Sequence, residues 1–591
     1  KITEIIYEGY TFKGTTTATV DGSDVYGGRS KAGNSTRENT ITVDSGTHTN
    51  AYGGWTTGAG STAAAEKRGD STGNKVTVRG TASISGTVYG GLTDVAGGKA
   101  TNNEVTVEKS IAGAVLGGQS AGDATGNRVF INANSGAVTG GKAVGEASGN
   151  IVTVGSVTVS SITGGAGATT KDNTVNINGT TVTDKIVGGT QADGTGNVLN
   201  IRGENSAQSV EGFQKMNFNT NSVAAGGTML NVTGTGETNV NWAELSATGT
   251  AVKPLTLLRN ANGIHLAGYT GAVKSETTDT TEMNIDVKKS GNKITELIYE
   301  GYTFKGITGV TSDGTDAWAG RSNAGNTTQD NTLTLDDAGK IYRNAYGGRT
   351  SGTGTKAAAD RQNDSRNNIV NYTAGTVTDN IYGGSAANGE ASGNTVNLGA
   401  ITTAANICGG YGMTTKDNII NLRGAKVTGT VMGGSAANGT GNTLAVYKPS
   451  EVYDFAGVQN LQFYADEMAA NEATPMLKLG VATKDIRGLD IGVNRSGAAP
   501  KLRKGDKITL MKTAGGALTT DEVIENKTNG MQTRKAEGMQ GASYRYEFEI
   551  TQTATGELTA TVTNAGFTEK AKSLVETRAG ASAFLNDGAD F

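Results

Sequence analysis

Short stretches in which apolar and polar residues alternate recur along most of the chain. Two clear examples are NIVTV at Asn150–Val154 and NTVNI at Asn173–Ile177, both rich in β-branched residues. Alternation with a period of two over four or five residues predicts a β-strand with one buried face. We therefore expect Val175 and Ile177 to point into a core and Asn176 to point outward.

Two kinds of marker frame these stretches. An asparagine opens the stretch and a Gly-Gly pair closes a neighbouring one, and in the middle of the chain successive markers lie 23 or 24 residues apart. A fixed period of this length indicates a solenoid. Because the segments between markers look like strands and show no helical periodicity, each repeat is predicted to be one coil of a parallel β-helix, with coils about 4.8 Å apart.

The opening asparagines have two possible roles. They could form a row of ligand-binding amides. Alternatively, they could form a stacked turn ladder, since asparagine tolerates left-handed backbone and hydrogen-bonds its own backbone. We favour the ladder, and expect the Gly-Gly pairs to supply positive φ or close backbone approach. The predicted ladder residues are Asn127, Asn150, Asn173, Asn197, Asn394, Asn418 and Asn442.

A longer repeat lies over the short one. Lys1–Gly14 recurs at Lys293–Gly306 with 13 of 14 residues identical and an offset of 292, whereas GTGN at Gly194 recurs at Gly439 with an offset of only 245. The second copy is therefore two coils shorter. A stack tolerates gain or loss of whole coils because each coil contacts only its neighbours. The predicted fold class is all-β: a right-handed parallel β-helix of about 24 residues per coil in two tandem units, with a short C-terminal α-helix.

The chain divides accordingly into five segments. They are a first β-helical stack (1–208), a larger-coil or capping β segment (209–292), a second stack (293–448), a C-terminal β segment (449–566) and a terminal helix (567–591). Gly291–Tyr299 resembles Thr555–Thr563, so each unit is expected to end on a closing strand. The sequence given starts on such a strand, and we expect either another copy before Lys1 or pairing of this edge with another molecule.

Composition removes several classes of protein. The 591 residues include 90 glycines but only 4 prolines, which excludes collagen, and the net charge of −4 gives no basic footprint for nucleic acid. With one cysteine, Cys408, no internal disulfide is possible. No run of about 18 apolar residues occurs, so no membrane-spanning helix is predicted.

Little in the sequence looks catalytic. Its two histidines, His48 and His265, are far apart, so no His-based triad or multi-histidine metal site is supported, and Cys408 is read as a small core residue. DGSD at Asp21–Asp24 and DGTD at Asp313–Asp316 could bind Ca²⁺, but we favour solvated turns. We predict no catalytic residues, no cofactor and no metal. The charged insertions at 66–70 and 360–364 are interpreted as surface decoration or contact sites rather than an active site.

A run of aromatics precedes several Gly-Gly pairs. The alternation that turns Val88 inward turns Tyr89 outward, so these side chains should form an outer strip. The strip could bind glycans or a host protein, or its rings could simply cover neighbouring coils. The candidate contact residues are Tyr26, Tyr52, Tyr89, Tyr346 and Tyr382.

The last part of the chain carries a family resemblance. A glycine-rich β-helical stack, then KGDKITLM at Lys504–Met511, then a helical pattern from Thr568 to Phe591, resembles the passenger and junction of a type V autotransporter. The resemblance implies an extracellular protein at the bacterial surface, anchored in the outer membrane or released. It also implies an autochaperone-like segment near 451–566 and a terminal helix that threads an outer-membrane β-barrel translocator of the same precursor.

The expected function is thus a non-catalytic adhesin or structural stalk serving adhesion, biofilm formation or host contact. Its ligand is unknown and self-association is possible. The alternative is a self-assembling extracellular filament or sheath subunit. A third, less favoured possibility is a β-helical enzyme acting on polysaccharides.

Overall fold

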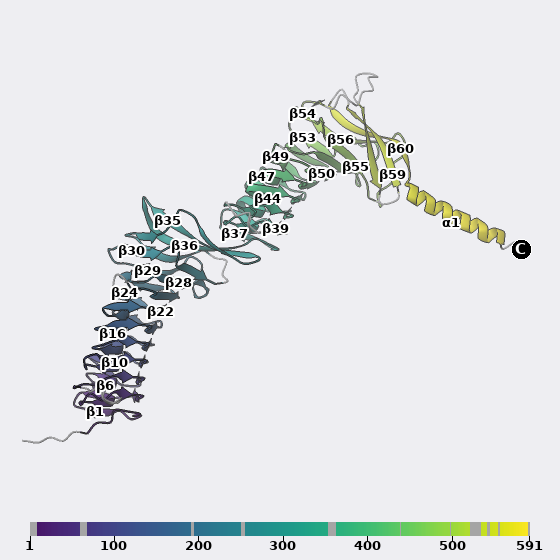
Figure 1. Cartoon of the computed structure of the whole chain (residues 1–591). Coiled ribbons are helices and arrows are strands. Elements are labelled where there is room, and N and C mark those ends of the chain that lie inside the picture. Colours follow the sequence, from purple (N-terminus) through teal and green to yellow (C-terminus); the bar gives the residue numbers. More distant parts are fainter. Residues whose placement is uncertain are drawn as a thin grey trace, which may run out of the picture. The chain divides into compact units, whose positions relative to one another are not determined.

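The computed structural model describes residues 9–59, 68–190, 194–249, 254–352, 362–437, 439–496, 498–519, 533–540, 544–552 and 556–588. The chain is nearly all β, a parallel β-solenoid of about 17 turns with a helix near the C-terminus (Figure 1). It forms two compact units. Unit 1 comprises Lys1–Ser275 and Met283–Gly301, and unit 2 comprises Glu276–Glu282 and Tyr302–Phe591.

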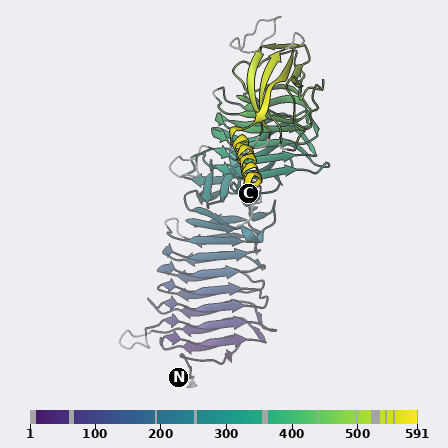
Figure 2. The same cartoon turned by 90° about the vertical axis from the view of Figure 1, so that its right-hand side faces the viewer.

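Unit 1 is a stack of coils in which each strand pairs with its equivalent one coil further along, as the rungs in Figure 2 show. All pairs in the three main sheets are parallel except β1 with β2. The first sheet contains β1 (Thr19–Asp21), β2 (Asp24–Ser30), β6 (Ala51–Thr56), β10 (Thr87–Thr93), β13 (Ala114–Ser120), β16 (Val138–Ala143), β20 (Ile162–Ala166), β24 (Lys185–Gly189) and β27 (Ser209–Glu211). The second contains β3 (Thr36–Arg37), β7 (Ser71–Thr72), β11 (Ala100–Thr101), β14 (Ala124–Thr125), β17 (Glu146–Ser148) and β21 (Thr169–Lys171). The third contains β4 (Thr40–Val43), β8 (Lys75–Val78), β12 (Glu104–Val107), β15 (Arg128–Ile131), β18 (Ile151–Val154), β22 (Thr174–Asn178), β25 (Val198–Arg202), β28 (Lys215–Asn219) and β31 (Leu245–Thr248).

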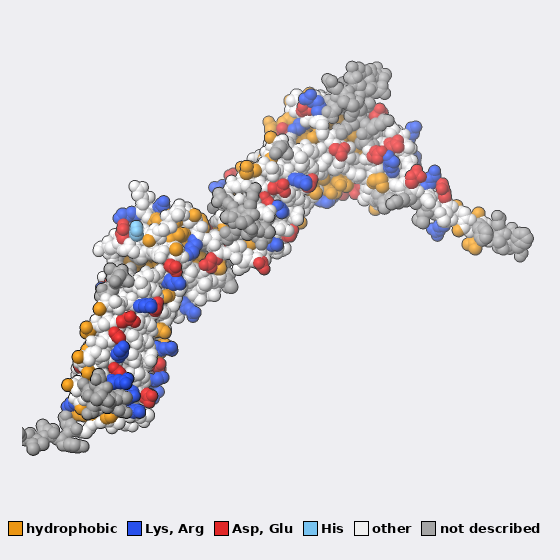
Figure 3. All heavy atoms as spheres, in the orientation of Figure 1, with side chains coloured by type: hydrophobic (Ala, Val, Ile, Leu, Met, Phe, Trp, Pro, Cys, Tyr) orange, Lys and Arg blue, Asp and Glu red, His pale blue; other side chains and the backbone are white. Residues whose placement is uncertain are grey.

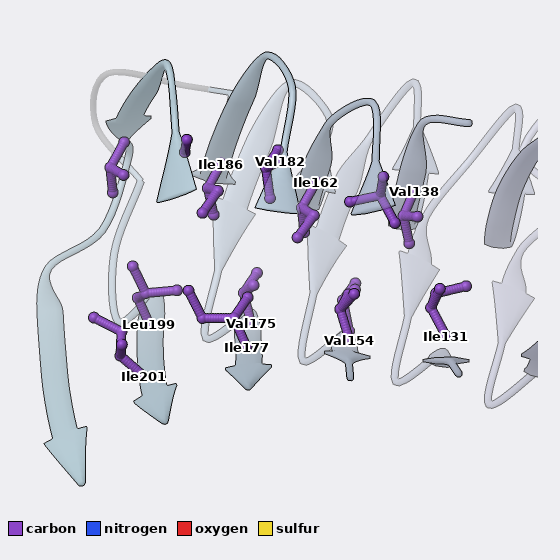
Figure 4. Close-up of a cluster of buried hydrophobic side chains, with 14 of the residues drawn as sticks. Ile131, Val138, Val154, Ile162, Val175, Ile177, Val182, Ile186, Leu199 and Ile201 are labelled. Carbon is purple, nitrogen blue, oxygen red and sulfur yellow. The ribbon is translucent and has the colours of Figure 1, made fainter. Parts of the chain in front are cut away.

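Columns of aliphatic side chains fill the interior of the stack. Val175 and Ile177 are at most 1% exposed and lie in register with Val152 and Val154 of the coil before, which confirms the predicted inward face (Figure 4). Asn176, between them, is half-buried on the outer face. Each buried Val, Ile or Leu contributes about 1.5–3 kcal/mol, so these stacked columns contribute to the cohesion between coils.

Antiparallel strands close unit 1. After the last parallel pair, β29 (Thr228–Val232) with β32 (Leu255–Asn260), strand β36 (Lys293–Thr303) joins β32 antiparallel, and β35 (Thr281–Ser290) and β34 (Lys274–Thr277) follow in the same sheet. Because β36 pairs with β32, unit 1 continues to Gly301, past the expected division at 292/293.

Unit 2 repeats this plan with longer strands. Its larger sheet contains β37 (Thr311–Ser312), β38 (Ala317–Ser322), β41 (Ile341–Thr350), β44 (Thr376–Ser392), β47 (Asn406–Lys416), β49 (Lys426–Gly434), β51 (Ser450–Ala456), β53 (Leu477–Leu479), β56 (Lys507–Thr513), β60 (Glu557–Phe567), β59 (Tyr544–Gln552) and β58 (Thr533–Gln540). The facing sheet contains β40 (Thr332–Leu335), β43 (Ile369–Tyr372), β45 (Thr395–Leu398), β48 (Ile419–Arg423), β50 (Thr443–Lys448), β52 (Asn460–Tyr464) and β55 (Asp490–Asn494). As β36 does on β32, β60 pairs antiparallel with β56.

The C-terminal helix α1 spans Glu569–Gly588. Thr568 caps it, since its Oγ1 accepts a hydrogen bond from the Ala571 amide at 3.3 Å. Most of its described side chains are exposed, including Leu585 at 72%. The side chains of Leu574 and Val575, two apolar residues of this helix, lie outside the described residues.

Candidate functional site

The opening asparagines form a continuous hydrogen-bonded ladder inside the stack. In unit 1 the Nδ2 of each donates to the Oδ1 of the next at 2.7–3.0 Å, and its backbone amide donates to the same oxygen at 3.0–3.2 Å. The series is Asn39, Asn74, Asn103, Asn127, Asn150, Asn173 and Asn197. In unit 2 it is Asn331, Asn368, Asn394, Asn418 and Asn442, with Nδ2–Oδ1 distances of 2.8–3.0 Å.

These ladder side chains have no access to an external ligand. All of them are 0% exposed. Each ladder ends on a glutamine, because Gln214 Oε1 accepts from the Asn197 amide and Gln459 Oε1 accepts from the Asn442 amide. The amides hold one coil to the next and are closed to an external ligand.

The physical basis of the ladder differs from the sequence-based explanation. The left-handed backbone belongs to the residue before each asparagine, as at Asn102 (φ 55°), Gly126 (φ 67°) and Asp172 (φ 53°). The asparagine itself bonds across coils rather than to its own backbone. We had expected asparagine at these positions because it tolerates a left-handed backbone. That explanation was wrong for the ladder residues themselves.

The Gly-Gly pairs are required by close approach to this ladder, not by positive φ. A Cβ on Gly117 would lie 2.4 Å from the Gly140 carbonyl oxygen, and one on Gly118 would lie 2.7 Å from Asn127 Nδ2. Both distances are shorter than real Cβ contacts. The glycines and the asparagine are thus one packing unit, which explains why the two markers recur together.

The outward tyrosines of unit 1 cover one another. Tyr52 stacks on Tyr89 with ring centroids 5.1 Å apart and planes 1° apart, and on Trp55 at 4.7 Å. The Arg29 guanidinium lies 4.4 Å from the Trp55 ring and 5.2 Å from the Tyr26 ring. Burial is the main reason that the pKa of Tyr52 lies well above its usual value.

Unit 2 has the same arrangement. Tyr346 stacks on Tyr382 at 5.1 Å, and Arg349 lies 4.8 Å from the Tyr346 ring. Burial raises the pKa of Tyr382 to about 12. At the end of this strip Tyr411 packs edge-on against Tyr382 at 5.7 Å and remains 44% exposed.

The predicted contact tyrosines therefore offer little surface. Tyr26, Tyr52 and Tyr346 are only 6–7% exposed, and Tyr89 and Tyr382 are half-buried. Sequence alternation placed the rings on the outer face correctly, but it did not reveal that arginines and neighbouring rings cover them. Tyr411, which directly follows the Gly409–Gly410 pair, was missed because it lies outside the repeating slot before the pair.

A second row of amides lies on the outer face of the third sheet of unit 1. Asn176 Nδ2 donates to Thr153 Oγ1 at 3.1 Å, Asn200 Nδ2 to Asn176 Oδ1 at 2.8 Å, and Asn217 Nδ2 to Asn200 Oδ1 at 2.8 Å. We call this the outer amide row. The sequence predicted only the outward direction of Asn176. The row could have been recognised from the sequence, because asparagine occupies the same outward position in three successive coils.

The outer amide row lines a hollow of about 570 Å³. Asn178, Arg202, Asn219 and Thr248 complete its polar rim. Its row members are half-buried, so they keep donor and acceptor capacity toward the outside. The volume is in the range of ligand sites, and the lining suits a ligand rich in hydroxyl groups.

The residues that could carry chemistry are used structurally. The Cys408 thiol is 1% exposed and donates to the Gly410 carbonyl at 3.1 Å; burial raises its pKa to about 12, which disfavours the thiolate that a nucleophile needs. His48 is buried with Nε2 3.2 Å from the Ser45 carbonyl oxygen. Within the described residues no cluster of three or more His, Cys, Asp or Glu is placed to hold a metal.

The acidic turns and insertions are engaged with neighbours. Asp21 pairs with Arg29 at 2.5 Å, and Asp316, which is 3% exposed, pairs with Arg343 and Arg349 at 3.3 Å. Of the insertion at 66–70, residues 66 and 67 lie outside the described residues, as do 360 and 361 of the other. Charged side chains of both signs are interspersed along the face in Figure 3.

In the part of the chain that the structure describes, none of the helical segments combines the length and apolar character needed to cross a bilayer. No protein-family model matches the sequence, and no curated protein matches it. What the chain does must therefore be argued from its stacked fold and from the surfaces described above.

Proposed function

We propose that this protein is a cell-surface passenger of the autotransporter type that acts as a non-catalytic adhesin or stalk, displayed outside a bacterial cell or released from it. The observation that carries the proposal is the stack itself. Coils joined by a buried amide ladder can be added or removed in whole-coil steps, as the second stack, two coils shorter than the first, illustrates. Such a scaffold suits display rather than turnover.

The C-terminal arrangement supports the same proposal. A closing antiparallel sheet of β58, β59 and β60 precedes α1, and the described part of α1 is mostly exposed. This order of elements is what the family resemblance implies for a passenger, its autochaperone-like segment and a helix that threads an outer-membrane translocator.

Within this function, we assign contact with a hydroxyl-rich ligand such as a glycan to the outer amide row. Three half-buried amides in one line present donors and acceptors at the spacing of the coils. Side chains already fixed by bonds to one another lose little conformational freedom on binding. Arg202 at the rim adds a cation for a charged sugar.

Localisation and contact are tested together. Antibodies raised against the chain should label intact cells of the source bacterium, and the purified chain should bind a set of immobilised glycans.

Asn200→Ala should weaken glycan binding at least about tenfold, or about 1.4 kcal/mol. Asn397→Ala is the matched control, because Asn397 Nδ2 donates to Asn371 Oδ1 at 2.8 Å in an equivalent amide pair of unit 2 that does not line this hollow, and it should leave binding unchanged. Labelling only after permeabilisation would refute surface display, and equal binding by both variants would refute the assigned contact surface.

A filament or sheath subunit is the second candidate. The internal duplication favours assembly of one repeat on another, and so does a hollow of about 550 Å³ on the first coil of unit 1, lined by Phe12, Arg29 and Asn34 among others. Electron microscopy of native material separates the two functions, because a subunit forms long periodic fibres and a stalk forms single rods.

A further inference from the structure

One carboxylate is completely buried at the start of unit 2. Glu282 is 0% exposed and lies at the end of a hairpin tip, Glu276–Glu282, that packs on the first coil of that unit. Its Oε2 accepts from Ser322 Oγ at 2.6 Å and from Asn326 Nδ2 at 2.5 Å. Its Oε1 accepts from the backbone amides of Asn323, at 2.5 Å, and Ala324, at 3.2 Å.

Four donors therefore converge on one glutamate. A buried carboxylate is stable only when it is fully hydrogen-bonded, and here two backbone amides and two side chains perform that task. The tip is also joined through its backbone, since the Phe304 amide donates to the Thr280 carbonyl at 2.9 Å. The first coil of unit 2 is thus a socket for an acidic turn.

Unit 1 contains the same donors in the same order. The run Tyr302–Leu335 corresponds to Tyr10–Val43 without a gap, so Ser30, Lys31, Ala32 and Asn34 stand where Ser322, Asn323, Ala324 and Asn326 stand in unit 2. The local backbone agrees as well. The Asn34 amide donates to Ser30 Oγ at 2.9 Å, as the Asn326 amide does to Ser322 Oγ at 2.8 Å.

In unit 1 these residues line a hollow of about 550 Å³ together with Phe12 and Arg29. The exposure of matched residues changes accordingly. Phe304 and Asn326 are fully buried, whereas Phe12 and Asn34 are half-buried and Ala32 is exposed. Lys31 replaces Asn323, so the hollow of unit 1 carries one more positive charge than its counterpart in unit 2. This charge adds to that of the Arg29 guanidinium, which also lines the hollow.

We propose that the hollow on the first coil of unit 1 is a carboxylate socket that takes the glutamate-bearing hairpin tip of a second copy of this repeat. The acidic turn bonds to Ser30, Asn34 and the backbone amides of residues 31 and 32, as Glu282 bonds to their counterparts. Arg29 and Lys31 favour the negative charge of the incoming tip. The site is independent of the surface role proposed above.

The test uses the whole chain and a fluorescent peptide spanning Lys274–Asp286. Binding is followed by fluorescence anisotropy, and the amide exchange of residues 31 and 32 is followed by hydrogen–deuterium exchange. We expect saturable binding that slows exchange at these two amides. A peptide with Glu282→Gln should bind at least about tenfold more weakly, because it loses the charge and presents a donor to donors.

A chain variant supplies the second arm. Asn34→Asp places a carboxylate against the incoming one and should weaken binding at least about tenfold, whereas Asn132→Asp, the same change at an exposed position, should bind like the wild type. Lack of saturable binding at about millimolar chain, or equal binding of the glutamate and glutamine peptides, overturns the proposal. Displacement by free glutamate at the same concentration as unlabelled peptide overturns the assignment to a hairpin tip.

Discussion

Replacing Asn150 by alanine removes one rung of the buried ladder in unit 1. Its Nδ2 donates to the Ala124 carbonyl at 3.0 Å and to Asn173 Oδ1 at 2.9 Å. Its Oδ1 accepts from the amide of Asn127 at 3.1 Å and from Asn127 Nδ2 at 2.9 Å. All four bonds are lost in Asn150→Ala, and water does not reach the groups left behind, because this position is 0% exposed.

The magnitude follows from those four bonds. A net loss of about 1 kcal/mol for each, with an added penalty for buried donors and acceptors that stay unpaired, gives about 4–6 kcal/mol. The matched control is Asn176→Ala in the outer amide row. That side chain is half-buried and makes two amide or hydroxyl contacts, which water can replace, so we expect less than about 1 kcal/mol.

Native-state hydrogen exchange is the appropriate assay, since a solenoid loses stability locally rather than throughout. The amide of Asn127, one coil before the missing rung, and the amide of Ile151, on the same coil as that rung, should exchange much faster in Asn150→Ala than in Asn176→Ala. The exchange rates of these amides give a free energy of local opening for each variant. If the opening free energies of the two variants differ by less than about 1 kcal/mol, the ladder does not hold the coils together.

Three further predictions use the same structure. Deletion of Arg128–Asn150, one whole coil, should leave a folded stack with an unchanged circular-dichroism spectrum per residue, and a loss of cooperative unfolding would contradict this. Gly117→Ala should destabilise unit 1 by about 1–3 kcal/mol in urea unfolding because its Cβ meets the next coil, whereas Gly236→Ala, which has open space, should cost well under 1 kcal/mol. Burial raises the pKa of the Cys408 thiol to about 12, so this thiol should resist thiol reagents in the folded protein. Because the thiol ionises at a lower pH in the unfolded chain, its contribution to stability, relative to Cys408→Ala, should be complete below pH of about 8.5 and lost as the pH rises toward 12. Rapid native labelling of Cys408, or a pH-independent difference, would contradict the last of these.

Period and alternation were sufficient to predict the solenoid, because they are direct consequences of one coil packing on the next. The inward direction of Val175 and Ile177 and the cap at Thr568 follow from local rules alone. The ladder's hydrogen bonds could not be derived in this way. They join residues more than twenty positions apart, and the left-handed residue turned out to be the neighbour of the asparagine.

Binding surfaces were harder to predict for a related reason. Alternation states only that Tyr52 points outward, and it does not state that Tyr89 and Trp55 stack on it. The hollow of unit 1 required comparison of two copies in three dimensions. Nothing local in Ser30–Asn34 indicates a socket until the corresponding five residues, Ser322–Asn326, are seen around Glu282 in unit 2.

The buried ladder also decides which folding errors this repetitive chain can make. Strands with the same alternation could pair out of step, but a slip of one residue would put Gly149 or Ile151 at the Asn150 rung and leave the donors of Asn127 without an acceptor. A slip by one full coil carries no such penalty, because it brings Asn173 to the same rung with its valine columns aligned. The ladder therefore disfavours a slip of one residue but not a slip of one whole coil. We therefore expect the favoured misfolded form to be an otherwise regular stack with one entire coil looped out, in line with the difference of two whole coils between the two stacks.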